Sequence, residues 1–308
     1  MTDSTLPAGR SAEMPHQQPA RRLANRGPAF LKYMRRNPSL AVGLALLLSV
    51  LLFVGIGSLL VDPDKAQPLS APNNQPPSWE HPFGTDKLGR ELLAVMIVGT
   101  PATLTVGLLA GLLGVAFATV VGFVGAYYGG WIDTIIRWVV DVGLTIPGLL
   151  ILIMLAISLK GSLTVIQLAL VVASTAWLWP TRTIRSQVLS LKQRAFVEVA
   201  RMSGMGGLEI IFRELMPNLI PYIAASLVST MGSAILAAIG IEALGLGPTE
   251  TPTLGMTIYW VIQYAGVLQG LWWWWLAPIV IIGIIFVGLF LASTGLDEIS
   301  NPRRRSTL

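Results

Sequence analysis

Side chains able to do catalytic or metal-binding chemistry are few in this chain and far apart. The sequence contains no cysteine and only two histidines, His16 and His81. Disulfides, cysteine nucleophiles, thiolate metal sites and histidine metal clusters are therefore excluded. Arg137, Asp141 and Glu242 are ionisable residues in or beside long apolar segments, but they form no catalytic cluster in the sequence. We therefore expect a protein that is not itself an enzyme and that has no metal site.

The glycine-containing segments do not match nucleotide-binding loops. A Walker A loop needs a Gly-Lys pair, and none of the five lysines follows a glycine. The segments Gly204-Met205-Gly206 and Gly245-Leu246-Gly247 lack the third glycine of a dinucleotide-binding loop. If the protein uses ATP, we expect a partner subunit to bind it.

Composition places these residues in a membrane protein. The chain has 308 residues, of which 53% are hydrophobic and 12% are charged, whereas a soluble domain has about 25% charged residues. No charged residue lies between Glu91 and Asp133 or between Glu250 and Asp297. The net charge of +5 does not come from a basic stripe interleaved with aromatics, so we expect membrane lipid and no nucleic acid as a partner.

Six apolar segments are long enough, at about 20 residues, to cross the hydrocarbon core of a bilayer. The expected spans are residues 40–61, 101–128, 135–159, 163–179, 222–244 and 276–294. The first follows 39 mostly polar and basic residues, so we expect it to remain as a signal anchor.

Lysine and arginine are divided unevenly between the two sides that these spans define. Lys65, Lys87, Arg90 and Lys160 fall on one side, and the other 17 of the 21 basic residues fall on the side of both termini. Positive residues favour the cytoplasmic side. We therefore predict an all-α integral membrane protein with six transmembrane helices, cytoplasmic N and C termini, and a place in the prokaryotic cytoplasmic membrane.

Four residues are candidates for a substrate path or gate. Arg137 and Asp141, four residues apart, share a helix face, and a structural ion pair is favoured over a substrate contact. Glu242 could equally face a path or the headgroup region. Trp272 begins a run of four tryptophans, for which an interfacial belt is favoured over a surface that stacks on sugar rings.

Two further patterns concern helix packing and the long loop between spans four and five. Small residues at four-residue steps predict a close helix contact; they are Ala110, Gly114, Ala118, Gly122 and Ala126. In the loop, Gly204 and Pro217 predict a helix–turn–helix, with the proline closing the second helix. Its basic residues could contact anionic lipid; they are Arg182, Arg185, Lys192 and Arg194.

Two motifs in this order resemble a known family. Glu198-Val199-Ala200, Gly204 and Leu215-Met216-Pro217 resemble the EAA loop of ABC importer permeases. Residues 81–91 resemble the H-x-x-G-T-D-x-x-G-R-D signature of the C-type permeases of dipeptide, oligopeptide and nickel importers; the matching positions are His81, Gly84, Thr85, Asp86, Gly89 and Arg90. The resemblance extends over about residues 30–305 and implies the fold of a type I ABC importer permease.

The resemblance also implies partners and a mechanism. Such a permease pairs with a homologous B-type permease and two cytoplasmic ATPases, and it receives substrate from an extracytoplasmic solute-binding protein. ATP and Mg would be bound by the ATPases, and this chain would hold no cofactor. Closure of the ATPases would move the EAA loop and switch the path between outward and inward states. The residues that take this coupling role are Glu198, Ala200, Arg201, Gly204 and Pro217, with residues 205–212.

The expected organisation combines the spans with these motifs. Residues 1–39 form a basic cytoplasmic arm, 40–61 the first transmembrane helix, and 62–100 the extracytoplasmic loop with the GTDxxGR motif. Residues 101–294 form a five-helix core that contains the coupling loop, at about 182–220, and residues 295–308 form a cytoplasmic tail.

The substrate and the class of protein leave alternatives. Peptides are favoured because they are the prevalent substrates of the family, and oligosaccharides are the alternative because some relatives carry them. A stand-alone secondary transporter is a more remote alternative, since the sequence has no inverted repeat and no inner proton relay. A membrane enzyme or scaffold would need a catalytic cluster or a large soluble domain.

Overall fold

The computed structural model describes residue 34 and residues 37–159 and 161–300. The expected N-terminal arm, apart from residues 34 and 37–39, and the last eight residues of the expected tail lie outside the described residues, as does Lys160. Within them the fold is all-helical, with one isolated antiparallel bridge between Thr85 and Glu91. The elements are α2 (Pro38–Leu60), the 3₁₀ turn η1 (Pro63–Ala66), α3 (Leu92–Tyr128), α4 (Gly130–Thr145), α5 (Gly148–Ser158), α6 (Val165–Ala176), α7 (Leu178–Lys192), α8 (Ala195–Met202), α9 (Gly207–Ile210), the π turn η2 (Ile211–Leu215), α10 (Met216–Glu242), α11 (Leu254–Gln263) and α12 (Trp272–Ser300).

Long apolar helices confirm an all-helical membrane protein. Within the described residues, four helices are long and apolar enough to cross a membrane: α2, α3, the continuous helix Gly207–Glu242, and α12. The third expected span is a pair of helices, α4 and α5, bent by 87°. The fourth consists of the 12-residue α6, followed by a break before α7. By length and composition, the described residues therefore contain four candidate spans, or five if the bent pair counts as one.

Prolines account for both breaks. Ile146 and Pro147, between α4 and α5, are extended or near-extended, with ψ of 131° and 114°, because the residue before a proline is disfavoured in the helical region. Between α6 and α7, Pro180 has no N–H to donate to the carbonyl of Ala176, the last residue of α6.

Helix α3 begins nine residues before the expected start at Pro101. Leu92, Ala94, Val95 and Met96 in its first turns are completely buried, and Pro101 lies inside the helix. The apolar contacts of these turns outweigh the loss of one backbone hydrogen bond at the proline. The expected loop 62–100 therefore ends at Glu91.

The small residues of α3 form a packing face within the chain, as their spacing predicted. Ala110, Ala118 and Ala126 are fully buried. A Cβ on Gly114 would lie 2.9 Å from the Cβ of Ala176, and one on Gly122 would lie 3.3 Å from Ile184. Helices α6 and α7 therefore approach α3 closely along this face.

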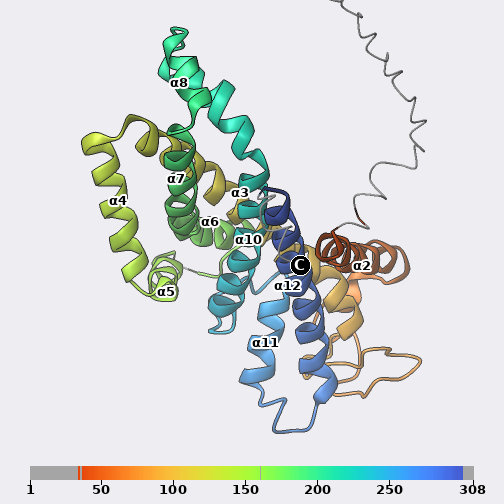
Figure 1. Cartoon of the computed structure of the whole chain (residues 1–308). Coiled ribbons are helices and arrows are strands. Elements are labelled where there is room, and N and C mark those ends of the chain that lie inside the picture. The colour runs from red at the N-terminus through yellow and green to blue at the C-terminus, as the bar shows by residue number, and fades with distance from the viewer. Residues whose placement is uncertain (1–33, 35–36, 160, 301–308) are drawn as a thin grey trace, which may run out of the picture.

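A helical hairpin, residues 195–212, stands at one end of the molecule (Figure 1). Its second helix does not end at Pro217, as the sequence suggested, because α9, η2 and α10 form one continuous helix of 36 residues, Gly207–Glu242. The π turn η2 ends two residues before Pro217, and such turns accommodate a local change in the backbone hydrogen-bond ladder. The proline-rich loop, residues 62–91, and α11 lie at the opposite end of the molecule (Figure 1).

Candidate functional site

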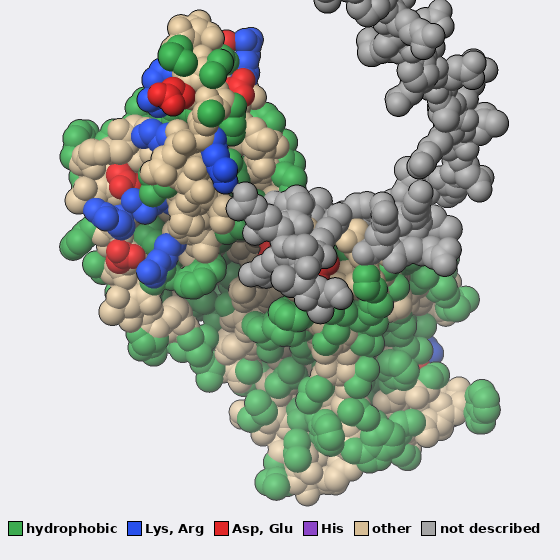
Figure 2. Space-filling model, in the orientation of Figure 1, with side chains coloured by type: hydrophobic (Ala, Val, Ile, Leu, Met, Phe, Trp, Pro, Cys, Tyr) green, Lys and Arg blue, Asp and Glu red, His purple; other side chains and the backbone are tan. Residues whose placement is uncertain are grey.

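The hairpin differs from the rest of the molecule in its surface. In Figure 2, acidic and basic side chains gather toward the end that carries α8, and much of the remaining face is hydrophobic. Charge at one end and apolar surface along the helices are typical of a protein whose helices lie in lipid and whose hairpin lies in water.

Gly204 forms the turn of the hairpin. Its φ is +82°, a conformation that residues with a Cβ rarely adopt. The N–H of Met205 donates to the carbonyl of Ala200 (3.2 Å), and the N–H of Gly204 donates to that of Arg201 (3.1 Å). This pattern is the Schellman motif that ends a helix on a glycine. The structure therefore confirms the glycine break between two helices.

The hairpin buries one apolar face and exposes another. Val197, Ala200 and Ile210 are buried against α3 and α7. Four large apolar side chains of the hairpin are 56–77% exposed: Val199, Met202, Leu208 and Phe212. Glu198, Arg201 and Pro217 are also exposed. Of the five predicted coupling residues, only Ala200 is buried in the core, and the other four are exposed.

Two basic residues of α7, for which the sequence left open a contact with lipid, bond within the protein next to the hairpin. The Arg185 guanidinium donates to both carboxylate oxygens of Asp133, at 2.5 and 2.7 Å, which joins α7 to the first turn of α4. This carboxylate also raises the pKa of Arg185 above its ordinary value. Lys192 Nζ donates to the carbonyl of Tyr127 at 2.5 Å, at the C-terminal end of α3, where a cation is favourable.

In the proline-rich loop, Asp86 and Arg90 form a buried ion pair. Arg90 Nε lies 2.6 Å from Asp86 Oδ2, and their side chains are 7% and 0% exposed. The other carboxylate oxygen, Oδ1, accepts the N–H groups of Leu88 (2.8 Å) and Arg90 (2.9 Å). Such hydrogen bonds compensate a buried charge. The pair therefore holds the turn between residues 86 and 90.

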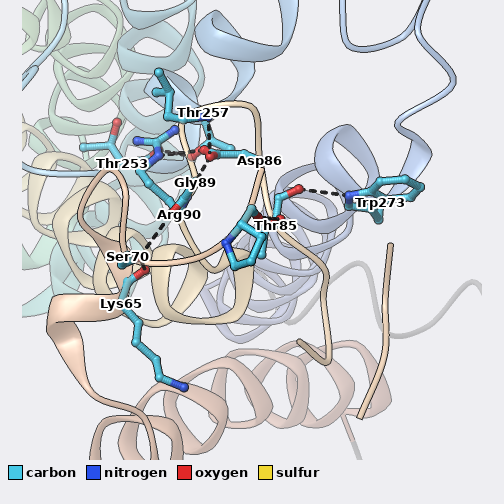
Figure 3. A network of polar contacts seen from close by, with 11 residues as sticks. Lys65, Ser70, Thr85, Asp86, Gly89, Arg90, Thr253, Thr257 and Trp273 are labelled. Atoms are coloured by element: carbon cyan, nitrogen blue, oxygen red, sulfur yellow. Dashed lines mark hydrogen bonds and ion pairs between the residues drawn. The ribbon is translucent and has the colours of Figure 1, made fainter. Parts of the chain in front are cut away.

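The other motif residues connect this turn to its surroundings (Figure 3). Thr85 Oγ1 donates to the Pro72 carbonyl at 2.6 Å, and the Thr85 carbonyl accepts Trp273 Nε1 at 3.2 Å. The carbonyl of His81 accepts the N–H of Gly84 at 2.8 Å. Gly89 has a φ of +71°, and a Cβ there would lie 2.6 Å from the Ala71 carbonyl oxygen. The motif thus folds the loop onto itself and onto the start of α12.

Comparison with known proteins supports one family. Residues 112–306 match the family model described as "Binding-protein-dependent transport system inner membrane component". The chain is 30% identical to the dipeptide transport system permease protein DppC of Alkalihalophilus pseudofirmus over 276 residues, covering 89% of each chain. The chain belongs to this family. It is a multi-pass permease of the bacterial inner membrane.

Two other relatives are similar over most of their length. The permease is 29% identical to the oligopeptide transport system permease protein OppC of Mycobacterium tuberculosis over 232 residues, which cover 75% of this chain and 79% of the relative. It is 29% identical to the dipeptide transport system permease protein DppC of Bacillus subtilis over 272 residues, which cover 88% and 84%. The family resemblance that the two sequence motifs indicated is therefore confirmed.

Glu242 of the permease faces neither an open path nor the headgroup region. It is 1% exposed, and its Oε1 accepts the hydroxyl of Thr253 at 2.6 Å. A Cβ on Gly255 would lie 2.0 Å from Glu242 Oε2, so this glycine leaves room for the carboxyl group. Glu242 therefore joins the end of α10 to the first residues of α11.

Thr253 is a partner of Glu242 that local sequence pattern did not single out. Its hydroxyl also accepts the N–H of Met256 at 3.1 Å and so caps the N-terminus of α11. A threonine directly before an apolar segment is the signal that could have identified it. Its bond to a glutamate 11 residues earlier has no such local signal.

Arg137 and Asp141 of the permease do not form the expected ion pair. Ion pairs within the described residues include Lys65–Glu91, Arg90–Asp86, Arg185–Asp133 and Arg213–Glu209, and none joins Arg137 to Asp141. Instead, Arg137 and Asp141 line a cavity of about 170 Å³ together with Arg185. Helix α4 is held to α7 through Asp133, which bonds to Arg185 and does not belong to the predicted pair.

Trp272 is separated from these groups. It is 51% exposed and lines an apolar groove of about 500 Å³ between α2, α12 and the proline-rich loop. Trp273 is bonded to Thr85, and Trp274 is completely buried. The four tryptophans therefore do not form a continuous stacking surface.

Proposed function

We propose that this permease is a subunit of an ATP-binding cassette importer for peptides. With a second, homologous permease it forms the translocation path, while a solute-binding protein delivers the peptide and two ATPase subunits supply the energy. The observation that carries this proposal is the apolar surface of the hairpin, which lies beyond the apolar helices of the bundle.

The hairpin has the properties of a protein-docking surface. Leu208 and Phe212 are 60% and 61% exposed, and Met202 is 77% exposed. A contiguous apolar patch on a water-facing segment costs free energy until a partner covers it. Arg185 and Lys192 tie the base of the hairpin to α4 and α3, so a displacement of the hairpin would be passed to the bundle. An ATPase that binds here could therefore drive the path.

We assign ATP and Mg to these ATPase partners and give this chain no reaction of its own. The family consists of membrane components of transport systems, and this chain lacks a Gly-Lys pair for a phosphate-binding loop. The chemical step of ATP hydrolysis would then occur outside this subunit.

We further propose six membrane crossings with both termini in the cytoplasm. The bent pair α4 and α5 would make one crossing, and α6 with the first residues of α7 would make another. The hairpin and the proline-rich loop lie at opposite ends of the molecule (Figure 1), which supports placing them on opposite sides of the bilayer. The basic residues support the cytoplasmic side for the hairpin.

The peptide substrate is inferred from the relatives. They are named dipeptide or oligopeptide permeases, and no observation favours oligosaccharides. A sugar-stacking surface would need several accessible tryptophan faces, whereas Trp274 is buried and Trp273 is engaged with Thr85.

The test is transport by the complete importer in proteoliposomes. We expect uptake of a labelled peptide only when the solute-binding protein, both ATPases and ATP are present. Peptide-loaded binding protein should also increase ATP hydrolysis, and an oligosaccharide panel should do neither. Uptake that proceeds without ATPases, driven by an ion gradient, would contradict the proposal and favour a secondary transporter.

A further inference from the structure

A cavity of about 210 Å³ lies where two broken helices meet α10. Its lining includes Leu144 from α4, Thr175 from α6, Trp179 from α7, and three residues of α10, Ser229, Thr230 and Ser233. Trp179, Ser229 and Ser233 are exposed, so the cavity opens on the surface of this subunit.

The two helix breaks border this cavity. Leu144 lies two residues before Ile146, where α4 ends, and the cavity is also lined by Ala176 and Pro180 on either side of the break between α6 and α7. The backbone is non-helical at Ile146 and Pro147, whereas Trp177, between α6 and α7, keeps helical dihedrals. Non-helical backbone within a membrane is tolerated where it is buried in protein or lines a water-filled cavity. A discontinuous membrane helix beside a polar cavity is typical of substrate sites in transporters.

Apart from the indole N–H of Trp179, the polar side-chain groups that line the cavity are hydroxyls. Thr230 Oγ1 donates to the carbonyl of Ser226 at 2.7 Å, and Ser233 Oγ donates to that of Ser229 at 3.2 Å. Thr175 Oγ1 donates to the carbonyl of Val172 at 3.3 Å. A hydroxyl whose hydrogen is used in this way still has oxygen lone pairs that can accept a hydrogen bond.

The exposed hydroxyls of α10 distinguish this surface from one that faces lipid. On α2, the exposed side chains along the middle of the helix include the large apolar Leu48, Leu51 and Leu52, and Ser49, which is also exposed, lines the apolar groove beside Trp272. On α10, Ser229 and Ser233 are exposed one helical turn apart. Polar side chains on a membrane helix face other helices or a water-filled cavity in preference to lipid.

We propose that this cavity is the part of the path where the peptide main chain contacts this subunit. The proposal rests on the peptide transport function proposed above. The N–H groups of a peptide backbone are hydrogen-bond donors, and the cavity offers hydroxyl acceptors and no charged side chain. An uncharged wall of acceptors would bind the feature that all peptides share and would not select among side chains by charge.

The chain's lack of cysteine allows a direct test by single substitution. We would prepare the complete importer in nanodiscs with Ser229→Cys, Ser233→Cys or, as the lipid-facing control, Leu48→Cys in this chain. Each variant would be exposed to a charged, water-soluble methanethiosulfonate reagent, and the mass of this chain would be followed with time. The measurement is repeated with binding protein and peptide present, and with a non-substrate oligosaccharide in place of peptide.

We expect both serine-position variants to be labelled at least about tenfold faster than Leu48→Cys, because the reactive thiolate forms in water and not in hydrocarbon. Peptide delivered by the binding protein should slow the labelling severalfold, whereas the oligosaccharide should not. Serine-to-cysteine replacement nearly preserves side-chain size, and each variant's uptake rate reports whether it is folded.

The outcomes separate the two proposals. If the wild-type complex transports peptide but Ser229→Cys and Ser233→Cys are labelled as slowly as Leu48→Cys, or peptide does not change the rate, the cavity is not part of the path. If the wild-type complex transports no peptide, the proposed function itself is wrong. Fast labelling that only oligosaccharide slows would overturn the peptide assignment of the cavity.

Discussion

The proline-rich loop and the hairpin, at opposite ends of the permease, differ in which side chains they bury and which they expose. The loop buries charged groups and pairs them within itself, as Asp86 and Arg90 do. The hairpin exposes apolar groups such as Leu208 and Phe212 and leaves them without cover in this chain. A segment whose buried polar groups are all bonded within it needs no partner for its stability. A segment with exposed apolar side chains is suited to bind a partner protein that covers them.

A glycine in each region shows the same difference between a closely packed and an open segment. Gly89 and Gly204 both have positive φ, at +71° and +82°. A Cβ on Gly89 would meet the Ala71 carbonyl and the Asn73 side chain, whereas a Cβ on Gly204 would meet nothing within 4 Å. Gly89 is therefore required by both backbone conformation and space, and Gly204 by conformation alone.

The strongest test of this comparison removes a buried charge from the loop. Asp86→Ala would leave Arg90 buried without its counter-ion, which typically costs about 3–5 kcal/mol. We expect a correspondingly large loss of thermal stability in the purified permease pair. Glu80→Ala, which removes an exposed carboxylate from the same loop, is the matched control. Equal stability of the two variants would contradict a structural role for the ion pair.

A methyl group added to the loop should have the next largest effect. We expect Gly89→Ala to destabilise the permease by about 2–4 kcal/mol, through left-handed backbone strain and overpacking together. Gly204→Ala should cost less because its surroundings are open. Denaturant unfolding of both variants measures the difference, and a greater loss at Gly204 would reverse the comparison.

A charge placed on the apolar surface of the hairpin should affect association rather than folding. We expect Leu208→Asp to weaken binding of the ATPases by about 2 kcal/mol, roughly thirtyfold, as at an interface hot spot. Unfolding should change by no more than about 0.5 kcal/mol. Leu268→Asp is the control, because Leu268 is 89% exposed and follows α11, at the other end. Surface-immobilised permease pairs titrated with ATPase would give both affinities; unchanged binding by Leu208→Asp would exclude this surface as the docking site.

Within the hairpin, two neighbouring glycines permit the finest comparison. Gly206 has a φ of −70° and Gly204 a φ of +82°, and a Cβ at either would meet nothing within 4 Å. Gly204→Ala should therefore cost about 1 kcal/mol locally, whereas Gly206→Ala should cost less, because its φ is ordinary and only its N-cap position favours glycine over alanine. Hydrogen exchange of the amides of α8 would detect this difference. Equal protection in both variants would mean that the turn conformation does not limit the hairpin's stability.

The sequence predicted those features that depend on local pattern. Long uncharged segments predicted the membrane helices, the four-residue spacing of small residues predicted the face of α3, and Gly204 predicted the turn. It did not predict which prolines interrupt a helix. Pro101, Pro221 and Pro278 lie inside continuous helices, whereas Pro147 separates α4 from α5. The Pro147-Gly148 dipeptide is a turn signal that the apolar run around it concealed.

Contacts between residues far apart in the sequence could not be predicted from local sequence pattern. Arg185 pairs with Asp133, 52 residues away, although Asp141 and Arg137 are better placed by helical spacing to pair with each other. Glu242 is buried because Gly255 and Thr253 fold back over it, which depends on tertiary structure. The candidate residues of the substrate path were therefore the least predictable part of the site.

The continuous helix Gly207–Glu242 has a mechanical consequence. At 1.5 Å per residue, its 36 residues form a rod about 54 Å long that begins in the hairpin and ends at the carboxyl group bonded to Thr253. The rod acts as a lever: pivoting it by about 10° at the hairpin would swing the far end by about 9 Å. One continuous helix thus links the hairpin to the segment around Thr253, with no loop between them.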